Sequence, residues 1–146
     1  MPPALITRLL RLHEGCRLHA YACPAGKLTI GWGRNIDATG PGLTQDEADL
    51  LLSHDIARCE VELVTTYPWT VHLDAVRHAV LLDLLFNLGL PKFKQFRRTL
   101  AAIEAGDYTG AAGHLLNSQW ARQVGTRAQR LAGMLATGTI PPELGA

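Results

Sequence analysis

Apolar residues recur three and four positions apart at the start of the chain, a spacing that places them on one face of a helix. They are Leu5, Ile6, Leu9, Leu10 and Leu12, and Gly15 is suited to end that helix. We therefore predict a helix that carries Glu14 in its last turn. Over residues 17–35 the pattern changes, because strand-favouring residues alternate with Gly and Pro. This mixture predicts a small β-sheet with tight turns.

The rest of the chain has helical patterns. Thr44-Gln45-Asp46-Glu47 is a capping box, and the helix that it starts should run to about Val64, before Pro68. The stretch from Leu73 to Leu88 is nearly all apolar, which predicts a helix buried on most sides and stopped by Gly89 and Pro91. Three more helices are expected at about 93–105, 108–117 and 126–136, with a short helical turn at Trp120.

These elements predict an α+β fold in one domain, 1–146, with two lobes. Residues 15–66 would form the small N-terminal lobe and a connecting helix. Residues 1–14 and 67–146 would form the mainly α-helical lobe.

Composition narrows the function. The 47% hydrophobic content supplies a core, and the chain does not have the composition of a disordered protein. Residues 1–75 carry 6 Lys and Arg against 9 Asp and Glu, whereas residues 76–146 carry 8 against 4. This mildly basic C-terminal half suits an anionic polymer, but it lacks the dense basic stripe of a nucleic-acid-binding protein. Ordinary solubilising charge explains it equally well.

The cysteine content and the pattern at the N-terminus argue against a disulfide-rich, metal-binding, secreted or membrane-spanning protein. Cys16, Cys23 and Cys59 are too few for a disulfide framework, and neither C-x-x-C nor His spacing indicates a metal site. Arg8 and Arg11 interrupt the apolar N-terminus, so we expect neither a signal peptide nor a transmembrane segment. A protein without either segment would be made in the cytoplasm and would need another protein to release it to the periplasm.

Three residues carry the chemistry. Glu14 is followed nine residues later by Cys23 and six residues after that by Thr29. A carboxyl on one wall of a cleft and two small polar groups on the other suit glycoside hydrolysis, which needs an acid on one face of the sugar and a positioned water on the other. Each residue has a plainer interpretation: a solvated Glu at a helix end, a buried structural Cys and a strand Thr.

The segment from Glu14 to Gly33 resembles the phage-type lysozymes, glycoside hydrolase family 24, in which a catalytic Glu is followed by Asp or Cys and then Thr at this spacing. Further blocks resemble the family in the same order along the chain: Thr44-Gln45-Asp46-Glu47-Ala48, Leu73-Asp74-Ala75-Val76-Arg77, Phe86-Asn87-Leu88-Gly89, Ser118-Gln119-Trp120 and Thr126-Arg127-Ala128. The resemblance covers nearly the whole chain. It implies a lysozyme-like fold with a short antiparallel sheet.

The resemblance also implies an activity. The chain is expected to be an endolysin-type muramidase that cleaves the β-1,4 bond between N-acetylmuramic acid and N-acetylglucosamine in peptidoglycan, with inversion, without a cofactor and as a monomer. Glu14 would be the acid, and Cys23 and Thr29 would hold the water. Cys23 is a water-positioning group or weak base, because a thiol cannot replace a carboxylate as a strong electrostatic partner.

Further residues are expected to support the site. By the resemblance, Arg127 would pair with Glu14, and Arg34 would pair with Asp55, where Arg replaces a common His. Candidates for the sugar cleft, chosen as aromatic, amide or hydroxyl groups, are Tyr21, Trp32, Asn35, Phe86, Asn87, Thr99, His114 and Trp120. Phe86 fits the core equally well, His114 a solvated position, and Trp120 with Asn87 a structural hydrogen bond.

Two alternatives to a muramidase remain at this stage. One is a peptidoglycan-binding module of the same fold that has lost catalysis through Cys23. The other is a lytic transglycosylase, which relies on one Glu and leaves anhydro-muramic ends. The sequence decides neither the preferred peptidoglycan chemistry nor whether the three cysteines form a disulfide.

Overall fold

The computed structural model describes residues 4–145, so residues 1–3 and 146 of the predicted helical lobe lie outside the described part. The chain divides into two compact units between Leu52 and Ser53. The first helix is counted with the strands in the N-terminal unit. The predicted grouping of this helix with residues 67–146 therefore stays a prediction.

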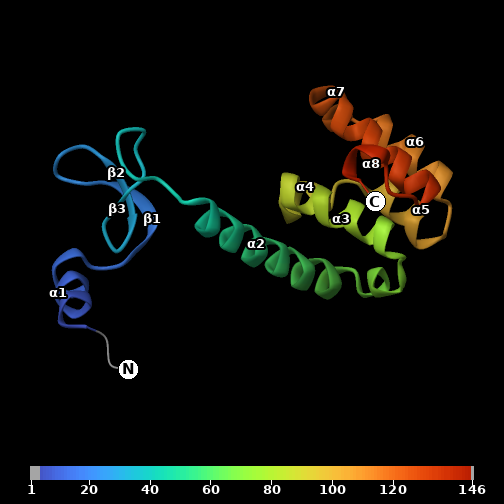
Figure 1. Ribbon diagram of the computed structural model, residues 1–146. Coiled ribbons are helices and arrows are strands. Elements are labelled where there is room, and N and C mark those ends of the chain that lie inside the picture. The colour runs from blue at the N-terminus through green and yellow to red at the C-terminus, as the bar shows by residue number, and fades with distance from the viewer. Residues whose placement is uncertain (1–3, 146) are drawn as a thin grey trace. The chain divides into compact units, whose positions relative to one another are not determined.

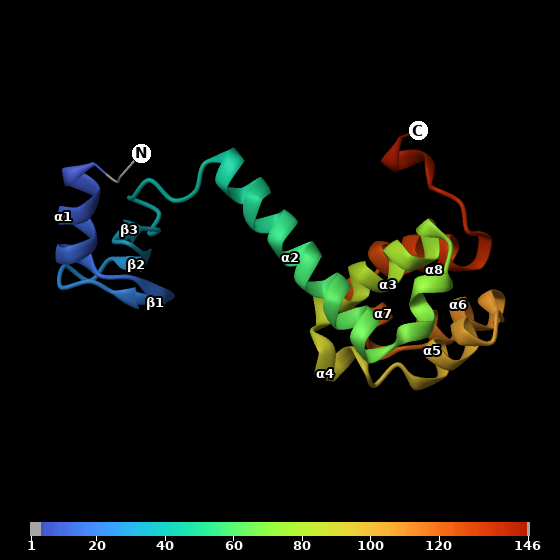
Figure 2. The ribbon, with the colours of Figure 1, turned by 90° about the horizontal axis from the view of Figure 1, so that it is seen from below.

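The N-terminal unit holds one helix and a three-stranded antiparallel sheet of order β1-β2-β3. Figures 1 and 2 show the helix beside the strands. The elements are α1 (Leu5–Glu14), β1 (Arg17–Ala22), β2 (Leu28–Gly31) and β3 (Arg34–Asn35). Tyr21 pairs with Thr29, and Ile30 pairs with Arg34 across the next turn. The predicted α+β fold class is confirmed.

The helix α2 (Gln45–Thr66) follows the sheet and continues into the C-terminal unit. Its predicted capping box is confirmed, because the Glu47 N–H donates to Thr44 Oγ1 (3.2 Å) and the Thr44 N–H donates to Glu47 Oε1 (2.9 Å). These two bonds satisfy backbone donors that a helix start leaves without partners.

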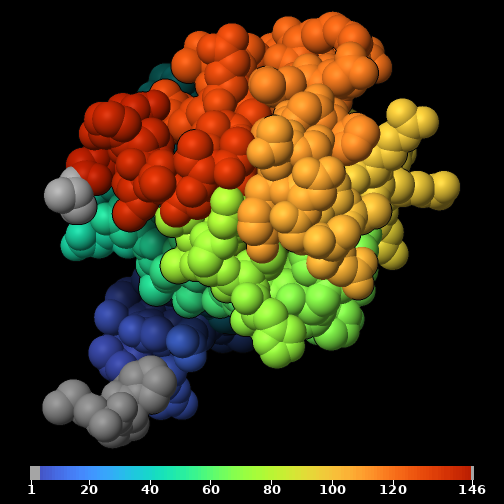
Figure 3. Space-filling model, turned by 90° about the vertical axis from the view of Figure 1, so that its right-hand side faces the viewer, coloured from blue at the N-terminus to red at the C-terminus, as the bar shows by residue number. Residues whose placement is uncertain are grey.

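Short helices build the C-terminal unit around one apolar helix, α3. Its elements are η1 (Pro68–His72), α3 (Ala75–Leu88), α4 (Leu90–Phe93), α5 (Arg97–Glu104), α6 (Tyr108–Leu116), α7 (Gln119–Val124), α8 (Thr126–Thr137) and η2 (Pro142–Leu144). Helix α6 packs against α5 and α8. In Figure 3 the atoms of α5 and α6, orange in the colour scale, form one continuous surface.

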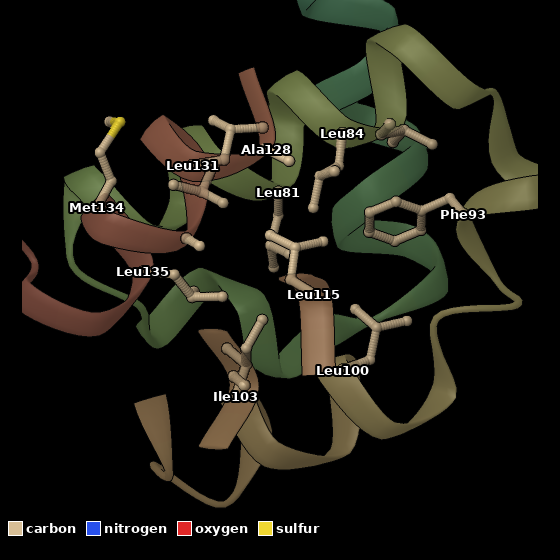
Figure 4. Close-up of a cluster of buried hydrophobic side chains, with 14 of the residues drawn as sticks. Leu81, Leu84, Phe93, Leu100, Ile103, Leu115, Ala128, Leu131, Met134 and Leu135 are labelled. Carbon is tan, nitrogen blue, oxygen red and sulfur yellow. The ribbon is translucent and has the colours of Figure 1, made fainter. Parts of the chain in front are cut away.

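The core of this unit lies between α3 and the helices that follow it. Figure 4 shows the side chains of α3, α5, α6 and α8 converging. The fully buried large side chains include Leu81, Leu84, Phe93, Ile103, Leu115 and Leu135. Burial of each such side chain stabilises the fold by about 1.5–3 kcal/mol. The apolar run therefore forms α3, which buries Val80, Leu81, Leu84 and Leu85 but leaves Ala75, Ala79, Phe86 and Asn87 exposed, so it is buried on one face and not on most sides as predicted.

The predictions differ from the structure after Gly89. Pro91 does not follow the end of a helix as expected. It lies in the first turn of a new helix, α4, where proline is well tolerated. The helix expected at 93–105 is instead two helices, with Phe96 preceding the second. Gly89 separates α3 from α4 with a positive φ of 75°, a conformation that favours glycine.

His78 connects α2, η1 and α3. Its Nδ1 lies 3.0 Å from the Thr70 carbonyl oxygen, and its Nε2 lies 2.8 Å from both Glu60 carboxylate oxygens. Both partners are acceptors, so the arrangement favours an imidazolium that donates from each nitrogen. Burial by itself would lower the pKa of His78, but the bonds to Glu60 and Thr70 outweigh it and the pKa is raised.

Candidate active site

Glu14 is the last residue of α1, and its carboxyl group lies against the turn between β2 and β3. A Cβ added to Gly33 would come within 2.8 Å of Glu14 Oε2. Gly33 has a φ of 80°, a conformation that favours glycine. The Glu14 side chain is exposed, so the N-terminal unit by itself does not bury this carboxyl.

The residue before Gly33 contacts the same helix. The Arg11 guanidinium lies over the Trp32 ring, with 5.4 Å between Cζ and the ring centroid, a cation–π distance. Trp32 remains 49% exposed. The β2–β3 turn therefore contacts α1 at two adjacent positions, one against Arg11 and one against Glu14.

Cys23 and Thr29 come together across the β1–β2 hairpin. The Cys23 N–H donates to the Lys27 carbonyl (2.9 Å), and the Gly26 N–H donates to the Cys23 carbonyl (2.8 Å). Thr29 is only 4% exposed, and its hydroxyl donates to the Lys27 carbonyl at 2.8 Å. The Thr29 hydroxyl is also within hydrogen-bonding reach of the Cys23 thiol, and the roles of both residues stay predictions.

The hairpin stabilises the thiolate form of Cys23. The backbone N–H of Lys27 is the largest cause, and it lowers the pKa of the thiol against the opposing effect of burial. The Ala25 N–H and the Thr29 hydroxyl lower it further. A lowered pKa raises the fraction of thiolate at neutral pH, and the thiolate is the form that can accept a proton.

Arg34 and Asp55 have partners other than those predicted. Arg34 Nη2 lies 2.8 Å from Glu47 Oε2, and Arg34 Nη1 donates to Glu47 Oε1 (2.8 Å) and the Gly42 carbonyl (2.9 Å). Asp55 pairs with Arg58, one turn further along α2, at 3.0 Å. These partners lie within each unit, and the pairing of Arg34 with Asp55, which would join the two units, stays a prediction.

Glu47 was predicted only to cap the start of α2, but it also pairs with Arg34. The hydrogen bond from Arg34, assisted by the Thr44 N–H, lowers the pKa of Glu47 to about 2. Its carboxylate fastens β3 to the start of α2. Arg34 was identified in the sheet and Glu47 in the capping box. Their separation along the sequence does not show that the two side chains contact each other.

Arg127 also has a partner that we did not predict. It pairs with Asp83 of α3, with Nη2 2.8 Å and Nε 2.9 Å from Asp83 Oδ1. Asp83 is the one acidic residue within the apolar run from Leu73 to Leu88 apart from Asp74, and this isolation is a signal that could have marked it. The pairing of Arg127 with Glu14 stays a prediction.

Three of the predicted cleft residues line one pocket in the C-terminal unit. The pocket has a volume of about 650 Å³, and Thr99, His114 and Trp120 line it. Among the ten lining residues that the sequence analysis missed, seven have amide or cationic side chains: Gln95, Asn117, Gln119, Gln123, Lys92, Arg97 and Arg98. Amides and cations can bind amide, hydroxyl and carboxylate groups.

Asn87 and Phe86 lie at the end of α3. Asn87 Oδ1 accepts a hydrogen bond of 2.7 Å from Trp120 Nε1, which confirms the predicted structural bond. Phe96 contacts the Trp120 ring edge-on, at 6.2 Å between centroids. Phe86 is 47% exposed, so it is not part of the core.

The remaining two candidates have internal partners in the N-terminal unit. Asn35 Oδ1 accepts a hydrogen bond from the Asp37 N–H (2.9 Å) and packs closely against Gly40. The Arg17 guanidinium lies 4.9 Å from the centre of the Tyr21 ring. Roles for these two residues in substrate binding stay predictions.

Among residues 4–145, no group of three or more His, Cys, Asp and Glu side chains is arranged to hold a metal ion. No helix in the same part of the chain is both long enough and apolar enough to cross a membrane.

Comparison with known proteins gives consistent matches over most of the chain. Residues 11–136 match the model of the phage lysozyme family. The chain is 32% identical to the endolysin of Acyrthosiphon pisum secondary endosymbiont phage 1, over 82% of this chain and 80% of that protein. It is 26% identical to probable T4-type lysozyme 1 of Dictyostelium discoideum, over 92% of this chain and 95% of that protein. It is also 27% identical to the pre-baseplate central spike protein Gp5 of Enterobacteria phage T4, over 95% of this chain but 29% of that longer protein.

Proposed function

The chain belongs to the phage lysozyme family, and from that premise we propose that it hydrolyses the β-1,4 bond between N-acetylmuramic acid and N-acetylglucosamine in bacterial peptidoglycan. The observation that carries the proposal is the Cys23–Thr29 pair in the hairpin, in the same unit as a Glu14 carboxyl that lies against Gly33. We propose Glu14 as the general acid that protonates the leaving sugar oxygen.

The Thr29 hydroxyl supports a role in holding the attacking water. Its single proton can go either to the Lys27 carbonyl or to the Cys23 thiolate, and in both cases its oxygen can accept a hydrogen bond from that water. The Cys23 thiol, whose pKa is lowered, is the group beside it that can take a proton. Attack by a water on the face opposite Glu14 would invert the anomeric carbon.

The pocket in the C-terminal unit supports peptidoglycan as the ligand. Its amide side chains suit acetamido and peptide groups, and Lys92, Arg97 and Arg98 suit the carboxylates of the peptide stems. An endolysin role, in which another protein releases the enzyme to the cell wall, is part of the same proposal. Its support is the similarity to a phage endolysin.

The test compares the wild type with Glu14→Gln on purified peptidoglycan, with the products read by mass spectrometry. We expect the wild type to release fragments that carry the mass of one added water, and Glu14→Gln to lose this activity while keeping its melting temperature. The change preserves the shape of the side chain and removes the transferable proton. Glu104→Gln, at the exposed end of α5, is the matched control.

Other results would point to the alternatives. Fragments with anhydro-muramic ends and no added water would identify a lytic transglycosylase. Binding of peptidoglycan by the wild type without any product would identify a binding module.

A further inference from the structure

The peptide group between Lys27 and Leu28 is hydrogen-bonded at both ends. Its carbonyl oxygen accepts from the Cys23 N–H (2.9 Å) and from the Thr29 hydroxyl (2.8 Å). Its N–H, which belongs to Leu28, donates to Asp37 Oδ2 at 3.0 Å. One peptide group therefore lies between the carboxylate of Asp37 and the two residues that are proposed to hold the water.

The turn after β3 fixes the Asp37 carboxylate in this place. The Asp37 N–H donates to Asn35 Oδ1 (2.9 Å), and the Ile36 N–H donates to the Leu28 carbonyl (2.8 Å). The Asp37 carbonyl accepts from the Gly40 N–H at 2.9 Å. Hydrogen bonds on both sides of Asp37 thus hold its side chain against the Leu28 N–H.

The Thr29 hydroxyl has one proton and two possible acceptors. Its oxygen lies 2.8 Å from the Lys27 carbonyl oxygen, and it can also donate to the Cys23 thiolate. The pKa of Cys23 is lowered chiefly by the Lys27 N–H and further by the Thr29 hydroxyl, whereas the charge of Asp37 raises it. A carboxylate that accepts from an N–H polarises the peptide group, so the carbonyl becomes a stronger acceptor. Asp37 therefore favours the Lys27 carbonyl over the sulfur as the acceptor of the Thr29 proton.

We propose that Asp37 is a positioning residue of the hydrolysis site, which acts through this peptide group to keep the Thr29 proton on the Lys27 carbonyl. The inference rests on the proposed roles of Cys23 and Thr29. With the proton held there, the Thr29 oxygen and the Cys23 sulfur can each accept one hydrogen bond from the attacking water. Both protons of the water are then held, and a lone pair of its oxygen is left for the anomeric carbon.

The test measures the pKa of Cys23, a property that does not depend on activity. The rate at which iodoacetamide alkylates Cys23 in the folded protein, read by peptide mass spectrometry across a pH series, gives the pKa of this thiol alone. Asp37→Asn keeps an acceptor for the Leu28 N–H and removes the charge. We expect it to lower the pKa of Cys23 by about half a pH unit, because the Thr29 hydroxyl then donates to the thiolate and the opposing charge is gone. The same change should lower kcat about threefold with little change in KM.

A Thr29→Val background separates the action through the hydroxyl from a direct action of the charge. Valine has no proton to redistribute, so in this background Asp37→Asn should lower the pKa of Cys23 by less than about half the wild-type amount. Asp46→Asn, exposed in the first turn of α2, is the matched control and should change neither this pKa nor kcat.

Equal decreases of the Cys23 pKa in the wild-type and Thr29→Val backgrounds would show that Asp37 acts on the sulfur directly, and would overturn the inference. A Cys23 pKa that Asp37→Asn leaves unchanged would also overturn it. If Asp37→Asn unfolds, Asp37→Ser, whose hydroxyl can also accept from the Leu28 N–H, takes its place with the same outcomes. The proposed function fails on a separate result, namely Glu14→Gln being as active as the wild type, whatever the pKa of Cys23.

Discussion

At the scale of single residues, the β1–β2 hairpin is built to stabilise negative charge on sulfur. The backbone N–H groups of Lys27 and Ala25 and the Thr29 hydroxyl all lower the pKa of Cys23. A thiol at this position is therefore a different group from an ordinary cysteine with a pKa of about 8.5. Two roles remain to be separated: orienting the water, and taking its proton.

Substitutions of Cys23 separate the two roles. If the thiol only orients the water, Cys23→Ser should keep activity within about tenfold, Cys23→Ala should lose about a hundredfold, and Cys23→Asp should be active. If the thiolate takes the proton, Cys23→Ser should resemble Cys23→Ala. Initial rates on peptidoglycan, with melting temperatures as the folding control, decide between them.

The pH dependence gives a second measure of the same residue. A thiolate base would make wild-type activity rise with pH through the Cys23 pKa, which lies below the ordinary value of the thiol. Cys23→Asp would move this rise to acid pH, because an aspartate loses its proton near pH 4. A rising limb that persists unchanged in Cys23→Ser would exclude Cys23 as the titrating group.

At the scale of elements, His78 is the contact whose stabilising effect depends on pH. The pKa of His78 is raised in the folded protein, so its contribution is complete below about pH 6.5, the unfolded value. It is lost as pH rises through the folded pKa. The contacts bind α3 to α2 and to η1 in the same unit.

We predict that His78→Gln lowers the free energy of unfolding by about 1 kcal/mol at pH 5.5 and by less at pH 9. The figure is modest because Glu60 is 42% exposed and solvent screens the pair. Denaturant unfolding at the two pH values checks it, with exposed His72→Gln as the control. An equal loss at both pH values would show that the ion pair contributes nothing.

Local patterns predicted the elements well, and the reasons are physical. The capping box of α2 joins residues three apart, and α3 follows from its own apolar run, so both could be predicted from a short window of sequence. The charge partners could not. Arg34 reaches Glu47 across 13 positions and Arg127 reaches Asp83 across 44, and only the folded chain decides such pairs.

At the scale of the whole molecule, the uneven charge of the two halves of the sequence has a structural counterpart. The basic residues Lys92, Arg97 and Arg98 line the pocket of the C-terminal unit beside the predicted contacts Thr99, His114 and Trp120. Composition showed an excess of cations in the C-terminal half without showing where they gather. Their position depends on how α4, α5 and α7 pack around the end of α3.

We predict that Arg98→Gln raises KM for peptidoglycan about threefold to tenfold with kcat nearly unchanged, because one charge-assisted contact contributes about 1 kcal/mol. The KM of the variant should also rise less steeply with added NaCl than that of the wild type. Arg122→Gln, exposed on α7 and outside the pocket lining, is the control. Equal effects of the two substitutions on KM would show that the pocket does not bind peptidoglycan.

Glu47 accepts three hydrogen bonds, and these bonds restrict how positions 34 and 47 can change among related sequences. One carboxylate accepts from the Thr44 N–H, which starts α2, and from two nitrogens of Arg34 in β3. A substitution of Arg34 alone leaves the Glu47 carboxylate without its cation. A substitution of Glu47 alone removes the ion pair with Arg34 and the hydrogen bond from the Thr44 N–H at the start of α2. Positions 34 and 47 should therefore covary in an alignment of relatives, with the carboxylate retained wherever a basic residue stands at position 34.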